Sequence, residues 1–363
     1  MALVFVHRGC AVDRSVHLSY FSLMKLIQLN GEDGGGQMLR TALSLAVITG
    51  QPFRMTNIRG QRRKPGLMRQ HLTCVKAAAE ISGGITDGAD IGSTELVFRA
   101  DKVKAGEYHF AIGTAGSTTL LLQTLLPALW LAKDKSTLRL SGGTHNPLAP
   151  CFDFIECVFL PLMKTLGAEA SLDLIETGFA PSGGGIIKCE ITPVSETFKE
   201  IQIEKRGPLI KQSLKVISRN LAPSIAERLF AAVQKKWPCD SPTIEERNEG
   251  PGQGLICLAE TEFENGREMI TGCAERNLSA EKLGHRIGHS MTTYLGTEAT
   301  IGRHLADQLL LPMALAGKGH FITTAPDNHV PTNISVIEKF LPVTFTIEDL
   351  DGGNFLISCS LEN

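Results

Sequence analysis

The chain has 363 residues, 43% hydrophobic and 20% charged, with a net charge of −2; this balance predicts about two globular domains and excludes a globally basic nucleic-acid-binding protein. Nine cysteines form no CxxC pair, which favours reduced thiols in a cytosolic protein over disulfides or a zinc site. No run approaches the roughly 18 apolar residues of a membrane span, so we expect no membrane contact.

The first 23 residues differ from the rest of the chain. Their apolar run is too short and too interrupted by charge for a signal peptide, and the periodic pattern begins at Met24. We therefore expect residues 1–23 to be a loose, disordered N-terminal extension. An extra ordered strand is the alternative.

A glycine-rich turn follows the first predicted strand. The strand from Leu26 leads into Gly34-Gly35-Gly36 and then into a helix. Glycines at such a turn let the backbone approach a phosphate, although a turn needed only for packing has the same pattern. Asp33 and Arg40 flank the turn and are candidate polar groups of a site.

The most basic stretch is residues 59–71, with five Arg or Lys in thirteen residues. A Lys-Pro-Gly break makes it a loop that leads into a predicted helix from Leu67 to Ile81. Arginine forks match phosphate oxygens, so Arg59 and Arg62 are candidate phosphate ligands. A solvated charged face is the alternative.

Glycine clusters then recur between predicted helices and strands. They stand at residues 34–36, 83–84, 142–143 and 183–185; the helices are expected at Thr118–Leu131 and Phe154–Leu166, and the strands at Thr137–Leu140 and Gly185–Ile191. This spacing predicts repeated α/β units of several tens of residues. Gln123, polar on an apolar helix, either bonds to the backbone or reads a base or ribose.

The sequence becomes more polar near residue 205, and apolar stretches joined by glycines return near residue 297. We therefore expect residues 205–297 to be an inserted domain. The helix predicted over Arg303–Gly317 carries Asp307 and Gln308. A carboxylate in an apolar helix must be paired or bound to a metal, and a structural ion pair is the commoner case.

The last stretch of interest is residues 326–340. Pro326, Asp327 and Pro331 predict a loop, and Thr332 is placed to cap the helix that follows. His329 would then lie in the loop beside a helix N-terminus, where it could attack or protonate a bound phosphate, or could simply be a hydrogen-bonded loop histidine.

Taken together, eight blocks of the sequence resemble the RNA 3'-terminal phosphate cyclases from about Met24 to the C-terminus. The blocks are G-G-G-Q-M-L-R (34–40), R-x-x-R-x-K-P-G-L-x-R-Q-H (59–71), A-G-S-T (115–118), L-Q-T-L-L-P-A-L (122–129), S-G-G-T-H-N-P (141–147), F-A-P-S-G-G-G (179–185), L-A-D-Q-L-L-L-P-M-A-L-A-G (305–317) and H-V-P-T-N-I (329–334). As a set they are highly specific.

The resemblance implies an α/β (α+β) fold in which repeated βαβαββ units form a large catalytic domain, residues 24–204 and 298–363. A smaller α/β domain, residues 205–297, would be inserted in it. The resemblance also implies a cytoplasmic protein that acts on RNA with a 3'-phosphate end. It leaves the oligomeric state and the natural RNA open.

The activity implied by the resemblance is ATP-dependent. A histidine that matches His329 would take AMP from ATP and release pyrophosphate. AMP would then pass to the RNA 3'-phosphate, and the vicinal 2'-hydroxyl would displace it, leaving a 2',3'-cyclic phosphate. Mg²⁺ or Mn²⁺ would accompany ATP.

The resemblance also assigns roles to other residues, all of them expectations. Arg40, Arg59 and Arg62, with Asp33, would face phosphates or RNA. The nucleotide would be bordered by Gln123, Pro150, His304, Leu305, Ala306, Asp307 and Gln308. Asp33 and Asp307 are candidate metal ligands, and Asp307 could instead orient His329.

Two features depart from the family pattern. Asp33, preceded by Glu32, stands where a glutamate usually precedes the three glycines, in a loop two residues shorter than is common. His304 stands where a tyrosine is frequent. Both departures bear on metal and nucleotide preference.

Two other classes of protein remain as alternatives. A non-catalytic cyclase-like ribosome-biogenesis protein would lack the histidine at position 329. An enolpyruvyl-transferase-like enzyme shares similar repeats but would not explain H-V-P-T-N-I.

Overall fold

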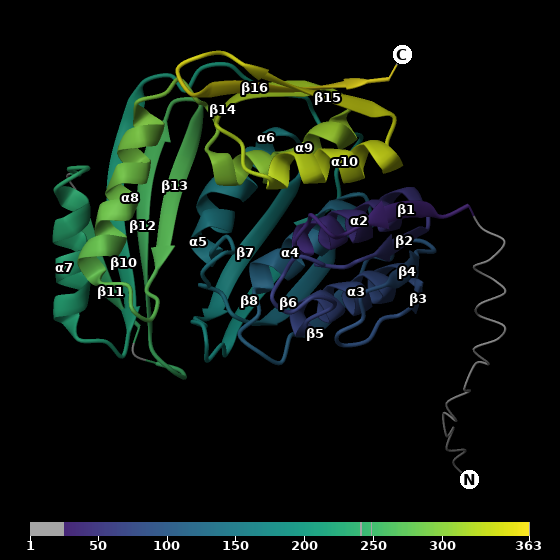
Figure 1. Ribbon diagram of the computed structural model, residues 1–363, viewed down its shortest axis with the longest axis horizontal. Helices are drawn as coiled ribbons and strands as arrows, with labels where there is room; N and C mark the ends of the chain where they lie inside the picture. Colours follow the sequence, from purple (N-terminus) through teal and green to yellow (C-terminus); the bar gives the residue numbers. More distant parts are fainter. Residues whose placement is uncertain (1–24, 240–241, 248, 363) are drawn as a thin grey trace, which may run out of the picture.

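The computed structural model describes residues 25–239, 242–247 and 249–362 (Figure 1). The predicted extension over residues 1–23 lies outside this part of the chain. Three units share one order of elements, β-α-β-α-β-β, and a fourth sheet with two helices interrupts the third unit.

The first unit contains β1 (Ile27–Asn30), α2 (Gly36–Thr49), β2 (Phe53–Thr56), α3 (Arg69–Ser82), β3 (Ile85–Asp87) and β4 (Leu96–Arg99). The second contains β5 (Glu107–Ala111), α4 (Thr118–Trp130), β6 (Ser136–Gly142), a broken helix, β7 (Glu169–Glu176) and β8 (Gly185–Thr192). The third contains β9 (Ile201–Ile203), α9 (Arg303–Ala316), β14 (Gly319–Thr324), α10 (His329–Phe340), β15 (Val343–Asp349) and β16 (Asn354–Leu361).

The three sheets have the same topology. Their strand orders are β1-β2-β4-β3, β5-β6-β8-β7 and β9-β14-β16-β15. In each, the first two strands pair in parallel, and the fourth strand runs antiparallel between the second and the third. The prediction of repeated βαβαββ units is therefore confirmed.

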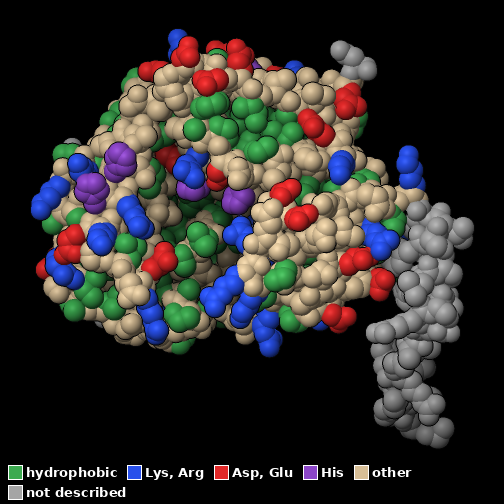
Figure 2. Space-filling model, viewed as in Figure 1, with side chains coloured by type: hydrophobic (Ala, Val, Ile, Leu, Met, Phe, Trp, Pro, Cys, Tyr) green, Lys and Arg blue, Asp and Glu red, His purple; other side chains and the backbone are tan. Residues whose placement is uncertain are grey.

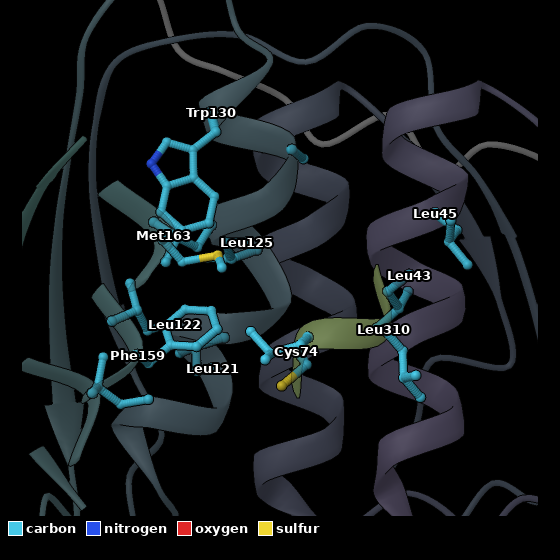
Figure 3. Packing of buried hydrophobic residues seen from close by; sticks show 14 of the residues in the cluster. Leu43, Leu45, Cys74, Leu121, Leu122, Leu125, Trp130, Phe159, Met163 and Leu310 are labelled. Carbon is cyan, nitrogen blue, oxygen red and sulfur yellow. The ribbon is translucent and has the colours of Figure 1, made fainter. Parts of the chain in front are cut away.

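Helices of the three units pack against one another and share a single hydrophobic core. Helix α2 contacts α3, α4 and α10, and α9 contacts α10. Figure 3 shows α2, α3 and α4 side by side, with Leu43, Cys74 and Leu122 among the side chains packed there. Because α4 is apolar nearly all round, it can lie buried at the centre of this core.

The interrupting region contains β10 (Leu209–Arg219), α7 (Pro223–Gln234), β11 (Pro242–Glu246), β12 (Gly254–Phe263), β13 (Gly266–Cys273) and α8 (Ala280–Leu295). It has its own sheet, β11-β10-β12-β13, and its own hydrophobic cluster around Leu229, Trp237 and Met291. We call it the inserted region. These features support a domain over residues 205–297, and that boundary remains a prediction.

Two predicted helices differ in detail. The helix expected from Leu67 begins at Arg69. The helix expected at Phe154–Leu166 is divided into α5 (Phe152–Phe154), a π-helical turn (Ile155–Phe159) and α6 (Leu160–Thr165). The N–H of Leu160 bonds to the carbonyl of Ile155, five residues back. Pro161 follows directly and has no N–H to donate, so the regular i→i−4 ladder cannot continue across it.

The prediction that Thr332 caps the last helix is wrong. Helix α10 begins at His329, and Asn328 is its N-cap. Pro331 falls in the first turn, where N–H groups have no partner within the helix, so proline does not break it. The Thr332 hydroxyl instead donates to the carbonyl oxygen of Asn328, at 2.8 Å.

Among the described residues, eight cysteines are free thiols and none is in a disulfide. In the same part of the chain, no helix combines the length and apolar character needed to cross a membrane.

Candidate active site

The N-terminal turns of five helices, α2, α3, α4, α9 and α10, meet at one place, which we call the helix-end site. Gln37 near the start of α2 donates to Asp307 of α9 at 2.7 Å. Thr41 of α2 donates to Asn333 of α10, also at 2.7 Å. Since free N–H groups and the positive ends of helix dipoles point outward at N-termini, this convergence attracts anions.

Helices α3 and α4 join the helix-end site through polar contacts at their own N-termini. The side-chain oxygen of Gln70 accepts from the backbone N–H of Ser117, the N-cap of α4, at 2.8 Å. His71 of α3 lies against Gly36, where an added Cβ would stand 2.2 Å from its Nε2 atom. The glycine at position 36 is therefore required by close approach. Figure 2 shows a hollow in the molecular face, with histidine, lysine and arginine side chains around it.

His329 is the first residue of α10, and its side chain is half exposed. Its backbone N–H donates to Asp327 at 2.9 Å, and its Nδ1 atom lies 3.6 Å from the other oxygen of the same carboxylate. Nε2 has no contact of this kind among the described residues. The imidazole is thus held on one side by Asp327, and its second nitrogen is free for a ligand.

Asp327 is therefore a carboxylate in contact with His329 that the sequence did not assign to the site, and the expectation that Asp307 orients His329 stays a prediction. The contact is local: Asp327 is two residues from His329 and can bond to its backbone N–H, as Asx side chains do at helix starts. Asp327 also lies 3.8 Å from the guanidinium of Arg303, the first residue of α9. One carboxylate thus links the ends of α9 and α10.

Asp307 is largely shielded from water and accepts a hydrogen bond from Gln37. Burial raises the pKa of this carboxyl group to about 7, the nearby charge of Asp327 adds to the shift, and Arg40 opposes it. The donor in that bond is the amide nitrogen of Gln37, and the amide oxygen, Oε1, is buried without a hydrogen-bond partner in the described structure. A buried unsatisfied acceptor at the mouth of a site suits a ligand that brings a donor.

The three arginines predicted to face phosphates differ from one another in their contacts within the protein. The guanidiniums of Arg40 and Arg62 form no hydrogen bond or ion pair with other described residues, and Arg62 lies against Gly35, within 3.0 Å of an added Cβ. Arg59 instead donates to the carbonyl oxygens of Lys64 and Gly66, at 2.9 and 2.8 Å, and so braces the basic loop. Burial lowers the pKa of Arg40, as expected for a cation without a partner.

Some of the residues predicted to face the nucleotide lie near the helix ends or at the surface, and others are buried in the core. Gln123 of α4 donates to Gln308 of α9 at 2.5 Å, and the Pro150 carbonyl accepts from Thr119 of α4 at 2.6 Å, so these groups lie near the helix ends. His304 is exposed at the surface, but neighbouring atoms shield its ring in part from water, and this desolvation, together with the charge of Arg303, lowers its pKa. Leu305 and Ala306 are buried in the core, where they position the helix.

The two candidate metal ligands do not form a metal site alone. The described residues contain no group of three or more His, Cys, Asp or Glu that could hold a metal ion. Asp33 is exposed and accepts from Gln61 at 2.8 Å. Since Mg²⁺ is commonly held by one or two carboxylates together with substrate phosphates, either residue fits such a partial role.

A separate cavity of about 390 Å³ lies between the second unit and the inserted region, and we call it the seam cavity. It is lined by Asp153, Glu156, Asp173, Lys215 and Arg247 among others, and by none of the predicted site residues. Its cations are paired: Lys215 lies 3.2 Å and Arg247 2.6 Å from Glu245.

Sequence reasoning missed four residues of the helix-end site: Gln37, His71, Asp327 and Asn333. Gln37, His71 and Asn333 stand inside the blocks quoted above, and Asp327 stands in the loop before His329. Gln37, His71 and Asn333 gave no sign of a role because their contacts join distant parts of the chain, whereas Asp327 contacts its near neighbour His329 and was assigned only to a turn.

The fold and the site define an α/β protein with an anion-attracting centre made of helix N-termini. The family model described as RNA 3'-terminal phosphate cyclase matches residues 31–347. The chain therefore belongs to the RNA 3'-terminal phosphate cyclase family.

Solved structures with some similarity are enolpyruvyl transferases. The enolpyruvyl transferase NikO from Streptomyces tendae is 12% identical, with a TM-score of 0.37, over 91% of this chain and 47% of that one. EPSP synthase from Acinetobacter baumannii is 13% identical, with a TM-score of 0.29, over 93% of this chain and 65% of that one. The chain thus spans less than two thirds of the length of either protein, and these low similarities assign it no activity.

Proposed function

We propose that the protein uses ATP to convert the 3'-terminal phosphate of an RNA into a 2',3'-cyclic phosphate, with His329 as the carrier of AMP. The observation that carries this proposal is the position of His329. Its imidazole is exposed at the first turn of α10, with Asp327 beside Nδ1. Beside the start of α2 lie the guanidiniums of Arg40 and Arg62, which form no ion pair or hydrogen bond within the described part of the chain.

In the first step, a lone pair on Nε2 of His329 attacks the α-phosphorus of ATP. A P–N bond forms, the bond between the α-phosphorus and the bridging oxygen breaks, and pyrophosphate leaves. Asp327 would hold the proton on Nδ1 and stabilise the positive charge that grows on the ring. Arg40 and Arg62 would bind the phosphate oxygens on which negative charge develops.

In the second step, an oxygen of the RNA 3'-phosphate attacks the same phosphorus, and the P–N bond breaks. AMP is now joined to the RNA through a phosphoanhydride, and His329 is regenerated. In the third step, the RNA 2'-hydroxyl attacks the phosphorus of the RNA's own 3'-phosphate. The anhydride bond to AMP breaks, AMP leaves, and the hydroxyl proton passes to a base or to water. Asp307, whose pKa lies near 7, is a candidate for that base.

Mg²⁺ or Mn²⁺ is proposed to accompany ATP. When bound, it would neutralise charge on the pyrophosphate leaving group. Asp307 and Asp33 are the carboxylates proposed to contribute a ligand, together with phosphate oxygens. Within the protein, Gln37 would orient Asp307 through its existing hydrogen bond.

The proposal is tested with an RNA that carries a labelled 3'-phosphate. The wild-type protein should form a phosphatase-resistant cyclic end only when ATP is present. His329→Ala should remain folded and form none. Given an RNA with a pre-adenylylated 3'-phosphate, His329→Ala should still form the cyclic end, because the imidazole is needed only as a carrier.

Two outcomes would remove the proposal. If the wild-type protein forms no cyclic end with ATP and either metal, this member of the family would be non-catalytic. If His329→Ala keeps full activity with ATP and an unmodified 3'-phosphate, the carrier is another residue, and His304 and His71 are the next candidates.

A further inference from the structure

The inserted region is tied to the rest of the chain where its two connections lie side by side. Arg206, in the incoming connection, donates to the carbonyl oxygens of Tyr294, at 3.2 Å, and of Thr297, in the outgoing connection. Its guanidinium also lies 5.0 Å from the ring centres of both Phe263 and Tyr294. The outgoing connection leads directly into α9, which carries His304 and Asp307.

Glu268 of β13 reaches across this joint. Its side chain is only 3% exposed, and Oε2 accepts a hydrogen bond from the backbone N–H of Gly302 at 3.1 Å. Gly302 is the N-cap of α9. No other hydrogen bond or ion pair of the Glu268 carboxyl group involves a described residue, and burial raises its pKa to about 8.

This contact replaces a cap that the local sequence cannot provide. Gly302 has no side chain to accept an N–H of the first turn. In a capping box, a glutamate at the third helical position bonds to the N–H of the N-cap, but that position is Leu305 in α9. Glu268 makes the same bond from a strand of the inserted region.

The fit at the joint is close. A Cβ atom at position 302 would stand 2.3 Å from the Glu268 carboxyl group, so only glycine leaves room for it. The carbonyl of Gly302 accepts from Leu305 at 3.1 Å and from Ala306 at 3.0 Å. One residue thus connects the Glu268 carboxyl group, through its two peptide groups, to the first turn of α9.

We propose that Glu268 is a positioning residue, which holds the first turn of α9 and so fixes His304 and Asp307 at the edge of the helix-end site. The inference rests on the proposed function, because those two residues are assigned there to ATP. Without the bond, the N–H of Gly302 would be unsatisfied and the first turn would open more often. The inserted region would in this way contribute to ATP use without touching ATP.

The test compares four variants. Glu268→Gln keeps an acceptor for the Gly302 N–H. Glu268→Ala removes that acceptor. The double variant Glu268→Ala/Gly302→Asp places an N-cap side chain in the space that the shortened residue 268 leaves. Gly302 has a φ of −71°, so aspartate fits its backbone. Glu262→Ala, in the neighbouring strand β12, is the control, since Glu262 pairs with Arg267 and not with α9.

Two measurements are made on each full-length variant. The first is amide hydrogen exchange over residues 302–307, which needs no activity. The second is the ATP dependence of self-adenylylation. We expect Glu268→Ala to lose about ten-fold protection at the first turn. We also expect its KM for ATP to rise several-fold, with a smaller change in the rate at saturating ATP. Glu268→Gln, the double variant and Glu262→Ala should resemble the wild type in both measurements.

The outcomes separate this inference from the proposed function. If the wild-type protein takes up no AMP, the proposed function fails, and exchange alone decides whether Glu268 holds the turn. If Glu268→Ala only lowers the melting temperature, while the exchange of residues 302–307 and the KM for ATP stay at wild-type values, Glu268 is merely structural and the inference is wrong.

Discussion

The seam cavity and the helix-end site both contain acidic and basic side chains, but the two places differ in whether these charges form ion pairs with one another. In the seam cavity, Lys215 and Arg247 share Glu245, and Asp153 is held at 2.9 Å by His145. In the helix-end site, Arg40 and Arg62 form no ion pair or hydrogen bond with a described residue, although the charges of Arg40 and Asp307 attract each other. The Asp307 carboxyl group accepts its side-chain hydrogen bond from the neutral amide of Gln37.

This difference separates structural charge from functional charge. Paired ions satisfy one another and need no ligand, whereas unpaired guanidiniums beside helix N-termini remain available to an anion. Four variants test this contrast, in order of expected effect.

The largest effect is expected at Asp307. Asp307→Asn keeps an oxygen that can accept from Gln37 but removes the titrating carboxyl group. We expect a folded protein that loses most of its self-adenylylation, about 10²-fold. The variant is assayed for AMP uptake and for thermal unfolding. A variant that unfolds easily while its folded fraction keeps full activity would make Asp307 a structural residue only.

The next effect is expected at Arg62, which lies against Gly35. Arg62→Ala should raise the KM for 3'-phosphate RNA roughly ten-fold or more, because a charged hydrogen bond to phosphate is lost. The matched control is Arg63→Ala, in the same loop and equally exposed, which should change the KM less than two-fold. Equal effects of the two variants at low and moderate salt would mean that the loop contributes only general charge.

The third effect concerns stability and pH. The pKa of Glu268 is raised to about 8 in the folded protein from its ordinary 4.5. The folded state therefore keeps a proton that the unfolded state releases, so wild-type stability should decline as pH rises from 4.5 to about 8.

Glu268→Gln removes this dependence. Tyr294 faces the same joint, and burial raises the pKa of its hydroxyl, so it stays neutral over this range. We expect the variant to exceed the wild type in unfolding free energy by on the order of a few kcal/mol at pH 9, and to match it near pH 5. Denaturant titrations at the two pH values measure this. Equal differences at both would show that Glu268 does not titrate in this range.

The smallest effect is expected in the seam cavity. Arg247→Ala removes an ion pair with Glu245 and a hydrogen bond to the Thr177 hydroxyl, at 3.0 Å. We expect a loss of about 1 kcal/mol in unfolding free energy and no change in AMP uptake or cyclisation. A large loss of cyclisation in a stably folded variant would make the seam cavity part of the RNA site.

Much of the fold follows from local pattern. Glycine clusters between apolar stretches predict the repeated units, and the polar stretch after residue 205 corresponds to the separate sheet from β10 to β13. The start of α10 was misplaced because proline and Asx residues suit both a loop and the first turn of a helix. Only the burial and bonding of that turn distinguish the two.

The site is less predictable, because its bonds join distant residues. Gln37 and Asp307 are 270 positions apart, and Thr41 and Asn333 are 292 apart. No spacing rule connects such pairs, so the sequence alone could not bring them together. Arg59 differs, because its bonds are local: it donates to the carbonyl oxygens of Lys64 and Gly66 in its own loop, a role that residue type alone does not indicate.

The central claim is that His329 carries AMP, and the most direct test needs only the protein, α-labelled ATP and Mg²⁺ or Mn²⁺. The account predicts a covalent label that is lost in acid and kept in alkali, as a phosphoramidate is. Peptide mapping should place the label on His329, and His329→Ala should take up none. A label that survives in His329→Ala, or one that is stable in acid, would contradict the account.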